Sequence, residues 1–277
     1  MSTAPKRIEV PAFPGGKRIC VTTSWDDGRV YDRWVVAAFN KLGIKGTFNL
    51  NSSILGRTGE LPTDESGGYM DASEIAELFA GHEVAVHSAT HPFLERLDSS
   101  QIITEIMDDR KALEELVGYP VRGMAYPFGT YNQQVITLLR DMGIVYSRTT
   151  GAGVTSFPPA EPLAWSSTLH AIRQTPNLQE TWDNFYGNPH AGGVFYVWAH
   201  SYEYAKDRSE IERSFAPLAG KPDVWYATNI ELYDYEDARN RLVIAANRKS
   251  VYNPSALTVT ISLDGILCDV VPGLTRL

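Results

Sequence analysis

Short apolar runs alternate with amphipathic segments along most of this chain. The apolar runs have the length of buried strands, and they predict strands over residues 17–24, 46–50, 83–87, 121–126, 144–149, 194–200 and 224–228. Apolar residues at helical spacing predict helices between them, over residues 32–42, 71–80, 99–117, 132–142, 209–218 and 230–242. This alternation is typical of a parallel sheet, and about seven such units indicate a closed or nearly closed α/β barrel.

Two segments depart from the alternation. Residues 151–193 are rich in glycine, proline, asparagine and aromatic residues, and we predict long loops there with one short helix. The tail 243–277 alternates apolar and polar residues around a turn signal at Asp264-Gly265, which predicts a small antiparallel β appendage with a hairpin. We therefore expect a single domain over 1–277, made of a core at about 17–240 and this C-terminal appendage.

Composition and charge narrow the classes of function. The chain has 277 residues, of which 43% are hydrophobic, enough to bury a sizeable core. Its net charge of −8 and isoelectric point near 5.3 argue against a nucleic-acid partner, because proteins that bind nucleic acid normally carry a basic face. The sequence contains no apolar run of 18 residues, so we expect no membrane span.

The N-terminus and the cysteines predict a cytoplasmic protein. Residues 1–7 are followed by Glu9 and two prolines instead of an apolar stretch, which is not the pattern of a secretory signal. Cys20 lies in a predicted strand and Cys268 lies near the C-terminus. Two such cysteines are typical of a reduced protein without a disulfide framework.

Reactive residues gather at the ends of the predicted strands. Asp26 and Asp27 follow the first strand, His87 and His91 follow the third, and His200 ends a later one. Because the carboxyl ends of parallel strands meet at one face of a barrel, we expect these side chains to converge. One carboxylate and two imidazoles form a ligand set for a divalent metal with an open position. The other aspartate is a candidate proton acceptor, so the pattern indicates a metal-dependent hydrolase.

Each of these signals also has a purely structural interpretation. Asp-Asp-Gly alone is typical of a turn, and His200 alone fits a packed histidine at the end of an apolar strand. Pro92 disfavours a helix at His91, so His87 is expected at a strand end and His91 on the loop that follows. The agreement of several motifs at strand ends favours the functional interpretation.

Four motifs carry a resemblance to a known family. They are Ser24-Trp25-Asp26-Asp27-Gly28, His87-Ser88-Ala89-Thr90-His91, Ala125-Tyr126-Pro127-Phe128 and Trp198-Ala199-His200. In these motifs the chain resembles the polysaccharide deacetylases that share the NodB homology domain, carbohydrate esterase family 4, over about residues 17–240. The resemblance implies a distorted (β/α)7 barrel, which agrees with the number of predicted strands.

The resemblance also implies a role for each reactive residue. Asp26 would be the general base, and His200 would be the general acid. The metal would be held by Asp27, His87 and His91. These roles suit the chemistry, because a metal activates water and an amine leaves only when it is protonated.

The third motif supplies further candidates and one departure. The backbone N–H of Phe128, beside Tyr126, is expected to stabilise an oxyanion. The arginine of the family's third motif is Ala125 here. Arg148 is the nearest candidate for a substitute and Arg122 is an alternative, although a solvated charge is an equally good interpretation of Arg148.

The family's fourth motif, Asp-x-x-Asp-Trp, has no clean counterpart. Trp165 or Trp182 is a candidate wall of the site, and His170 is a candidate to face it, although a packing role fits each of them. Trp25 replaces the usual phenylalanine of the first motif and is expected to enlarge the apolar wall behind the metal.

These observations predict an enzyme that removes acetyl groups from N-acetylated sugars, with zinc as the expected ion and cobalt, nickel or iron as alternatives. The expected partner is an acetylated carbohydrate, and the sequence is compatible with a homo-oligomer. One alternative is an intracellular amidase that opens small cyclic amides of the imide or ureide type. The other is a catalytically silent carbohydrate-binding domain, which the presence of both an acid and a base disfavours.

Overall fold

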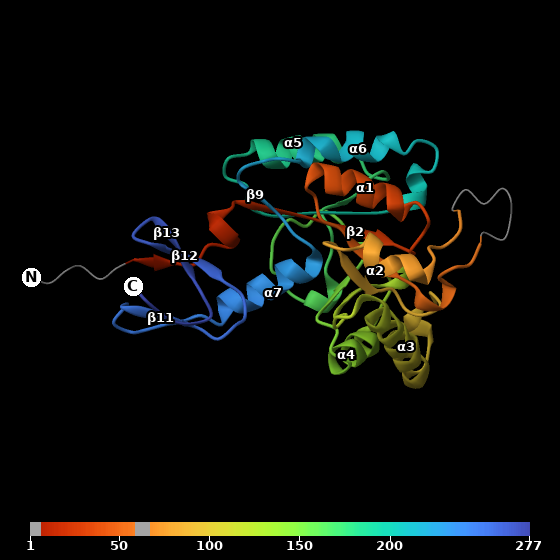
Figure 1. The fold of residues 1–277 in the computed structure, drawn as a ribbon, viewed down its shortest axis with the longest axis horizontal. Helices are drawn as coiled ribbons and strands as arrows, with labels where there is room; N and C mark the ends of the chain where they lie inside the picture. The colour runs from red at the N-terminus through yellow and green to blue at the C-terminus, as the bar shows by residue number, and fades with distance from the viewer. Residues whose placement is uncertain (1–6, 59–66) are drawn as a thin grey trace, which may run out of the picture.

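The structure is a computed structural model that describes residues 7–58 and 67–277. Residues 1–6 lie outside the described residues. They form most of the N-terminal segment from which we expect no secretory signal. The chain forms an α/β barrel with a small β appendage beside it (Figure 1).

A curled parallel sheet forms the barrel. Its strands are β2 (Ile19–Asp26), β3 (Thr47–Leu50), β4 (Glu83–Val86), β5 (Gly123–Ala125), β6 (Tyr146–Arg148), β7 (Leu169–His170), β8 (Gly193–His200) and β9 (Val224–Tyr226). They are ordered β6-β5-β4-β3-β2-β8-β7. The first half of β2 pairs with β9 and its second half with β3, so β2 is the central strand of the fold.

A short segment closes the gap between the ends of this sheet. Trp165 forms a parallel bridge with Arg148 of β6, and Leu169 a few residues later pairs with Val197 of β8. The segment 151–193 is largely loop, as predicted, and its one α-helix is α5 (Leu178–Gly187). The prediction missed β7, because a strand of two residues shows no periodicity. The distorted barrel expected from the sequence is therefore confirmed.

Helices cover the outside of the sheet (Figure 1). They are α1 (Asp32–Leu42), α2 (Ile75–Leu78), α3 (Ser99–Val117), α4 (Gln133–Asp141), α5 (Leu178–Gly187), α6 (Ser209–Phe215) and α7 (Asn229–Asn240). The predicted bounds of α1 and α3 are confirmed. The helix predicted over 71–80 is a 3-10 turn followed by the single turn of α2, and the helix predicted over 209–218 changes to a 3-10 turn after α6, next to Pro217.

The appendage consists of antiparallel strands. They are β1 (Ile8–Glu9), β10 (Val243–Ile244), β11 (Ser250–Asn253), β12 (Val259–Leu263), β13 (Ile266–Val270) and β14 (Gly273–Arg276). In the described part of the chain they form two three-stranded sheets around a small apolar cluster. The predicted hairpin turn is confirmed, since Asp264 and Gly265 both have positive φ and join β12 to β13. Within the described residues, none of the helices has the length and apolar character needed to span a bilayer.

Candidate functional site

The strand ends meet in one pocket at the carboxyl face of the barrel. Its volume is about 390 Å³, within the usual range for small-ligand sites. It is lined by Asp26, Asp27, His87, His91, Tyr126, Phe128, Gly129, Thr150, Arg173, Trp198, His200 and Tyr202. The convergence predicted from the sequence is therefore present for both aspartates and for the three histidines of the motifs.

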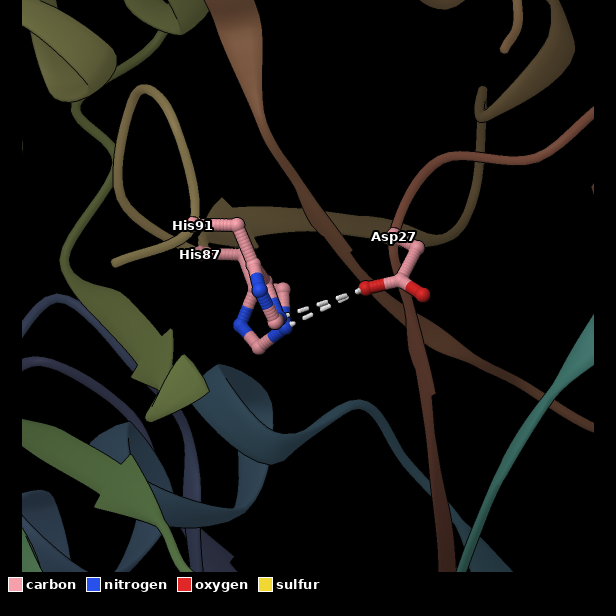
Figure 2. Close-up of side chains that lie close together, drawn as sticks. All are labelled: Asp27, His87 and His91. Carbon is pink, nitrogen blue, oxygen red and sulfur yellow. Dashed lines mark ion pairs between the residues drawn. The ribbon is translucent and has the colours of Figure 1, made fainter. Parts of the chain in front are cut away.

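Asp27, His87 and His91 form a compact ligand set (Figure 2). One carboxylate oxygen of Asp27 lies 3.5 Å from Nε2 of His87 and 3.6 Å from Nε2 of His91. All three candidate ligand atoms lie within 4.8 Å of one another, which suits a single divalent ion. Nδ1 of His87 lies 2.7 Å from the carbonyl oxygen of Ala125, so in the neutral ring this nitrogen carries the proton and Nε2 has the lone pair that could bind a metal.

Unusual backbone conformations aim these side chains. Asp27, Ser88, His91 and Phe128 all have positive φ, between 58° and 80°. Residues other than glycine rarely adopt this region, and such positions concentrate at functional sites. The strand-to-loop turns that carry the ligands are therefore held by the fold and are not relaxed local conformations.

Asp26 is buried and strongly partnered. Arg148 forms an ion pair with one of its oxygens, and Nδ2 of Asn49 donates a hydrogen bond of 2.8 Å to the other. Burial opposes ionisation of Asp26, but Arg148 and the nearby His87 outweigh it and lower the pKa of the carboxyl. Asp26 is thus an ionised carboxylate at neutral pH, able to accept a proton.

Two residues of the candidate ligand set, Asp27 and His91, are in the protonation state that a metal requires. Burial opposes ionisation of Asp27, but its contact with His87 lowers the pKa of this carboxyl below its ordinary value. Burial, together with the neighbouring His87, lowers the pKa of His91 to about 4, so its imidazole is neutral near pH 7. Burial opposes protonation of His87, but the carboxylates of Asp26 and Asp27 outweigh it and raise the pKa of this imidazole. Divalent ions bind carboxylates and neutral imidazoles, so a metal bound here would displace a proton from His87.

Of the two candidates to replace the arginine of the third motif, only Arg148 contacts Asp26. Its side chain is fully buried, and its guanidinium lies 4.2 Å from the centre of the Trp198 ring as well as against Asp26. The alternative candidate, Arg122, instead pairs with Asp234 at 2.6 Å, away from the pocket lining. Sequence reasoning did not select Trp198 as a wall of the site, although it lies two residues before His200.

Sequence reasoning also missed Glu203. The backbone N–H of His200 donates to this carboxylate at 3.0 Å, and Nδ1 of the His200 ring lies 3.5 Å from the same oxygen. Arg173 forms an ion pair with the second oxygen. Burial opposes ionisation of Glu203, but contacts with His170 and His200 lower the pKa of its carboxyl. The spacing of three residues from His200 is the only signal that the sequence offered.

His170 completes this second cluster without being arranged as a metal ligand. Its Nδ1 accepts hydrogen bonds from the backbone N–H groups of Ile172 and Arg173, at 3.2 and 3.1 Å. A neutral ring then carries its proton on Nε2, which lies 3.2 Å from Glu203. His170, His200 and Glu203 are therefore close enough to hold an ion, but their hydrogen bonding favours a proton-linked cluster over a metal site.

The rim of the pocket is aromatic. Phe128 is 48% exposed and stacks on Phe93, with ring centroids 3.8 Å apart. Tyr126 lines the pocket, and its hydroxyl donates to the carbonyl oxygen of Leu163 at 2.7 Å. Tyr202 lies beside His200, with ring centroids 5.0 Å apart. Phe128, Tyr126 and Tyr202 thus line the same pocket as the reactive groups.

Three predicted wall residues lie elsewhere. Trp25 alternates with Asp26 along β2, so its ring points outward to Phe39 under the helices. Trp165 is buried against the ring of Tyr146, and Trp182 of α5 is buried in the main core. In the described part of the chain, none of these tryptophans lines the pocket.

The comparisons with known proteins agree with this geometry. Residues 14–147 match the family model for polysaccharide deacetylase. Over this part, about half of its length, the chain is similar to the polysaccharide deacetylases. The peptidoglycan-N-acetylglucosamine deacetylase PgdA of Listeria monocytogenes is 29% identical over 137 residues, which are 47% of this chain and 26% of PgdA. The match thus spans about a quarter of the length of that relative.

Solved structures support the same fold. A Mycobacterium smegmatis structure assigned to the polysaccharide deacetylases is 18% identical, with a TM-score of 0.59 over 87% of this chain and 96% of the other. The peptidoglycan deacetylase PdaC of Bacillus subtilis is 18% identical, with a TM-score of 0.51 over 82% of this chain and 95% of that chain. At these identities the likeness concerns the fold alone.

Proposed function

We propose that this protein is a metal-dependent hydrolase that removes acetyl groups from N-acetylated sugars, with zinc as the bound ion. One observation carries the proposal: a compact carboxylate-imidazole-imidazole set lies in the same pocket as an ionised Asp26 and the ring of His200. A hydrolase that uses a metal to attack an amide with water combines these three parts, namely a metal, a base and an acid.

The first step is the attack of water on the acetyl carbonyl. Asp27, His87 and His91 would hold the ion, which, when bound, polarises the acyl oxygen and makes water more acidic. Asp26 accepts the proton that the attacking water loses. Arg148 keeps Asp26 ionised and fixes its orientation, and Asn49 holds its other oxygen.

The second step is the departure of the amine. Nitrogen leaves an amide only after protonation, and His200 is the donor placed in the pocket. Glu203 faces Nδ1 of His200, so the opposite nitrogen of the ring is directed to the substrate. The backbone N–H of Phe128 supports the negative charge that develops on the acyl oxygen.

The pocket favours a sugar over a small cyclic amide. Its entrance is bordered by the exposed ring of Phe128 and by Tyr202, and the apolar faces of sugar rings stack on such surfaces. A site for a single small ring would instead be closed to solvent. The relative PgdA, whose name identifies a peptidoglycan-N-acetylglucosamine deacetylase, supports the same substrate class.

Metal analysis and acetate release test the proposal together. We expect close to one zinc ion per chain, activity that chelators abolish and zinc restores, and acetate from N-acetylglucosamine oligomers. A His87→Ala, His91→Ala variant should lose the metal, while His190→Ala, at an exposed position outside the pocket, should keep it. Hydrolysis of cyclic imides or ureides with no acetate from any acetylated sugar would contradict the substrate class, and full metal content in the double variant would contradict the ligand set.

A further inference from the structure

The segment His87–His91, called the histidine loop below, follows a strained path. Ser88 and His91 both have φ of 63°, in the left-handed region that residues other than glycine rarely adopt. Such conformations persist only where the surroundings enforce them. The result of this path is that Nε2 of His87 and Nε2 of His91 face the same oxygen of Asp27 (Figure 2).

Asn51 holds the histidine loop from one side. This residue is fully buried, and its amide nitrogen donates to the carbonyl oxygens of His87 and Ser88, at 2.6 and 2.8 Å. The neighbouring Ser53 donates its backbone N–H to the carbonyl oxygen of Ala89 at 3.2 Å. Three successive carbonyl groups of the loop are therefore fixed by the segment that follows β3.

Helix α3 holds the loop from the other side. Asp109 accepts a hydrogen bond of 3.0 Å from the backbone N–H of His87. The carboxylate of Glu105 accepts from the backbone N–H and the hydroxyl of Thr90, at 2.9 and 2.6 Å. The carbonyl oxygen of Glu105 accepts from the N–H of Ala89 at 3.0 Å. Glu105 and Asp109 are four residues apart, so both acceptors lie on the same face of the helix.

We propose that Asn51, Glu105 and Asp109 are positioning residues that preorganise the histidine loop for metal binding. The inference rests on the proposed function, because it takes His87 and His91 to be ligands. Without these contacts the loop relaxes to ordinary backbone conformations, and the two Nε2 atoms separate. Metal binding then has to restore the strained path, and the free energy that this takes appears as weaker affinity.

Asn253 provides a matched control. It is as deeply buried as Asn51, and its amide nitrogen also donates to two backbone carbonyls, those of Leu257 at 2.7 Å and Val270 at 3.0 Å. These contacts lie in the β appendage. Asn51→Ala and Asn253→Ala therefore remove the same kind of contact, so a general loss of stability affects both variants.

The test is titration of the metal-free proteins with Zn²⁺ in competition with a chromophoric chelator. For Asn51→Ala we expect a dissociation constant roughly 10–100-fold higher than that of the wild type, the usual effect of losing a partner of a metal ligand. For Asn253→Ala we expect the wild-type value. An unchanged dissociation constant in Asn51→Ala, or equal weakening in both variants, overturns the inference.

Asp109→Asn decides the question if Asn51→Ala does not fold. This change keeps the volume and one acceptor oxygen, but its new NH₂ group faces a backbone N–H donor of either His87 or Ser52. Weaker Zn²⁺ binding in the folded variant supports the inference, and wild-type binding refutes it. A wild-type protein that binds no Zn²⁺ overturns the proposed function, and the inference with it.

Discussion

Asp26 and Asp27 are adjacent in the sequence, yet their surroundings give them different tasks. Asp26 forms an ion pair with the buried Arg148. Asp27 has a positive φ of 80°, and its carboxylate faces the imidazoles of His87 and His91. A carboxylate already paired with a guanidinium is less available to a metal, and the pairing keeps it ionised and so able to take up a proton. The geometry of one residue therefore separates the two proposed roles.

The first prediction compares these aspartates. Asp26→Asn should keep the metal and lose most of its turnover, because the proton acceptor is removed and the ligands are spared. Asp27→Asn should raise the dissociation constant of the metal itself. Metal content and acetate release, measured on both variants after reloading with zinc, check the difference. Equal loss of metal in both, with activity retained by reloaded Asp26→Asn, would mean that the two roles are misassigned.

The second prediction concerns His200. Because an amine must be protonated to leave, His200→Ala should lower kcat on an acetamide by about 10²–10⁴-fold. The loss should be much smaller on an aryl acetate, whose leaving group departs with little protonation. Glu203→Gln should show the same preference with a smaller loss, because it removes the charge facing Nδ1 but keeps an acceptor. Equal losses on both substrates would indicate a structural role for His200.

At the scale of elements, the N-terminus of α7 depends on residues of the barrel. The N–H of Asn229 donates to the hydroxyl of Thr47 at 3.0 Å, and the N–H of Ile230 donates to the buried Glu83 at 2.8 Å. Tyr146 also donates to Glu83, at 2.6 Å. Burial is the largest effect on Glu83 and raises the pKa of its carboxyl to about 7. The helix thus packs on a carboxyl that titrates near neutral pH.

The third prediction follows from this raised pKa. Between the ordinary value of 4.5 and about 7, the folded protein retains a proton on Glu83 that the unfolded chain has released. The free energy of unfolding therefore falls as the pH rises through this window. Glu83→Gln removes this contribution, so its stability relative to the wild type should increase between pH 5 and pH 8. Urea unfolding of both proteins at the two pH values measures the change, and a constant difference would disprove it.

At the scale of the whole molecule, the β appendage lies beside the amino-terminal side of the barrel. Gly15, just before β2, donates its N–H to the hydroxyl of Thr260 in β12 at 2.9 Å. The backbone N–H of Thr260 in turn donates to the hydroxyl oxygen of Tyr235 in α7 at 3.1 Å. The candidate metal ligands follow the opposite, carboxyl ends of the strands. The β appendage and the candidate site therefore lie in different parts of the molecule.

The sequence is compatible with a homo-oligomer, and self-association of the chain stays a prediction.

The fourth prediction uses this separation. Ile261 is fully buried in the apolar cluster of the appendage, so Ile261→Ala should lower the free energy of unfolding by about 2–5 kcal/mol. The zinc dissociation constant and kcat/KM should stay at wild-type values wherever the variant is folded. Ile266→Ala, in the same hairpin but 74% exposed, serves as the control and should change neither quantity. Loss of zinc affinity in folded Ile261→Ala would mean that the appendage supports the site.

Local patterns alone determined a large part of this protein. The bounds of α1 and α3 followed from apolar residues at helical spacing, because helix periodicity is a property of a short stretch of sequence. The gathering of Asp27, His87 and His91 followed from their places at strand ends, since parallel strands in a barrel bring those ends to one face.

The tertiary structure alone decided which distant side chains meet. Arg148 reaches Asp26 across 122 residues of sequence, and only the order of the strands in the sheet selects it over Arg122. Trp25 points away from the pocket because the curl of the sheet decides which side of a strand faces the interior. β7 is too short for any local pattern to identify it, and it forms because β8 offers it a free edge. Patterns in the sequence reveal interactions between residues that are close along the chain. These contacts instead join residues far apart in the sequence, which meet only when the elements pack together on folding.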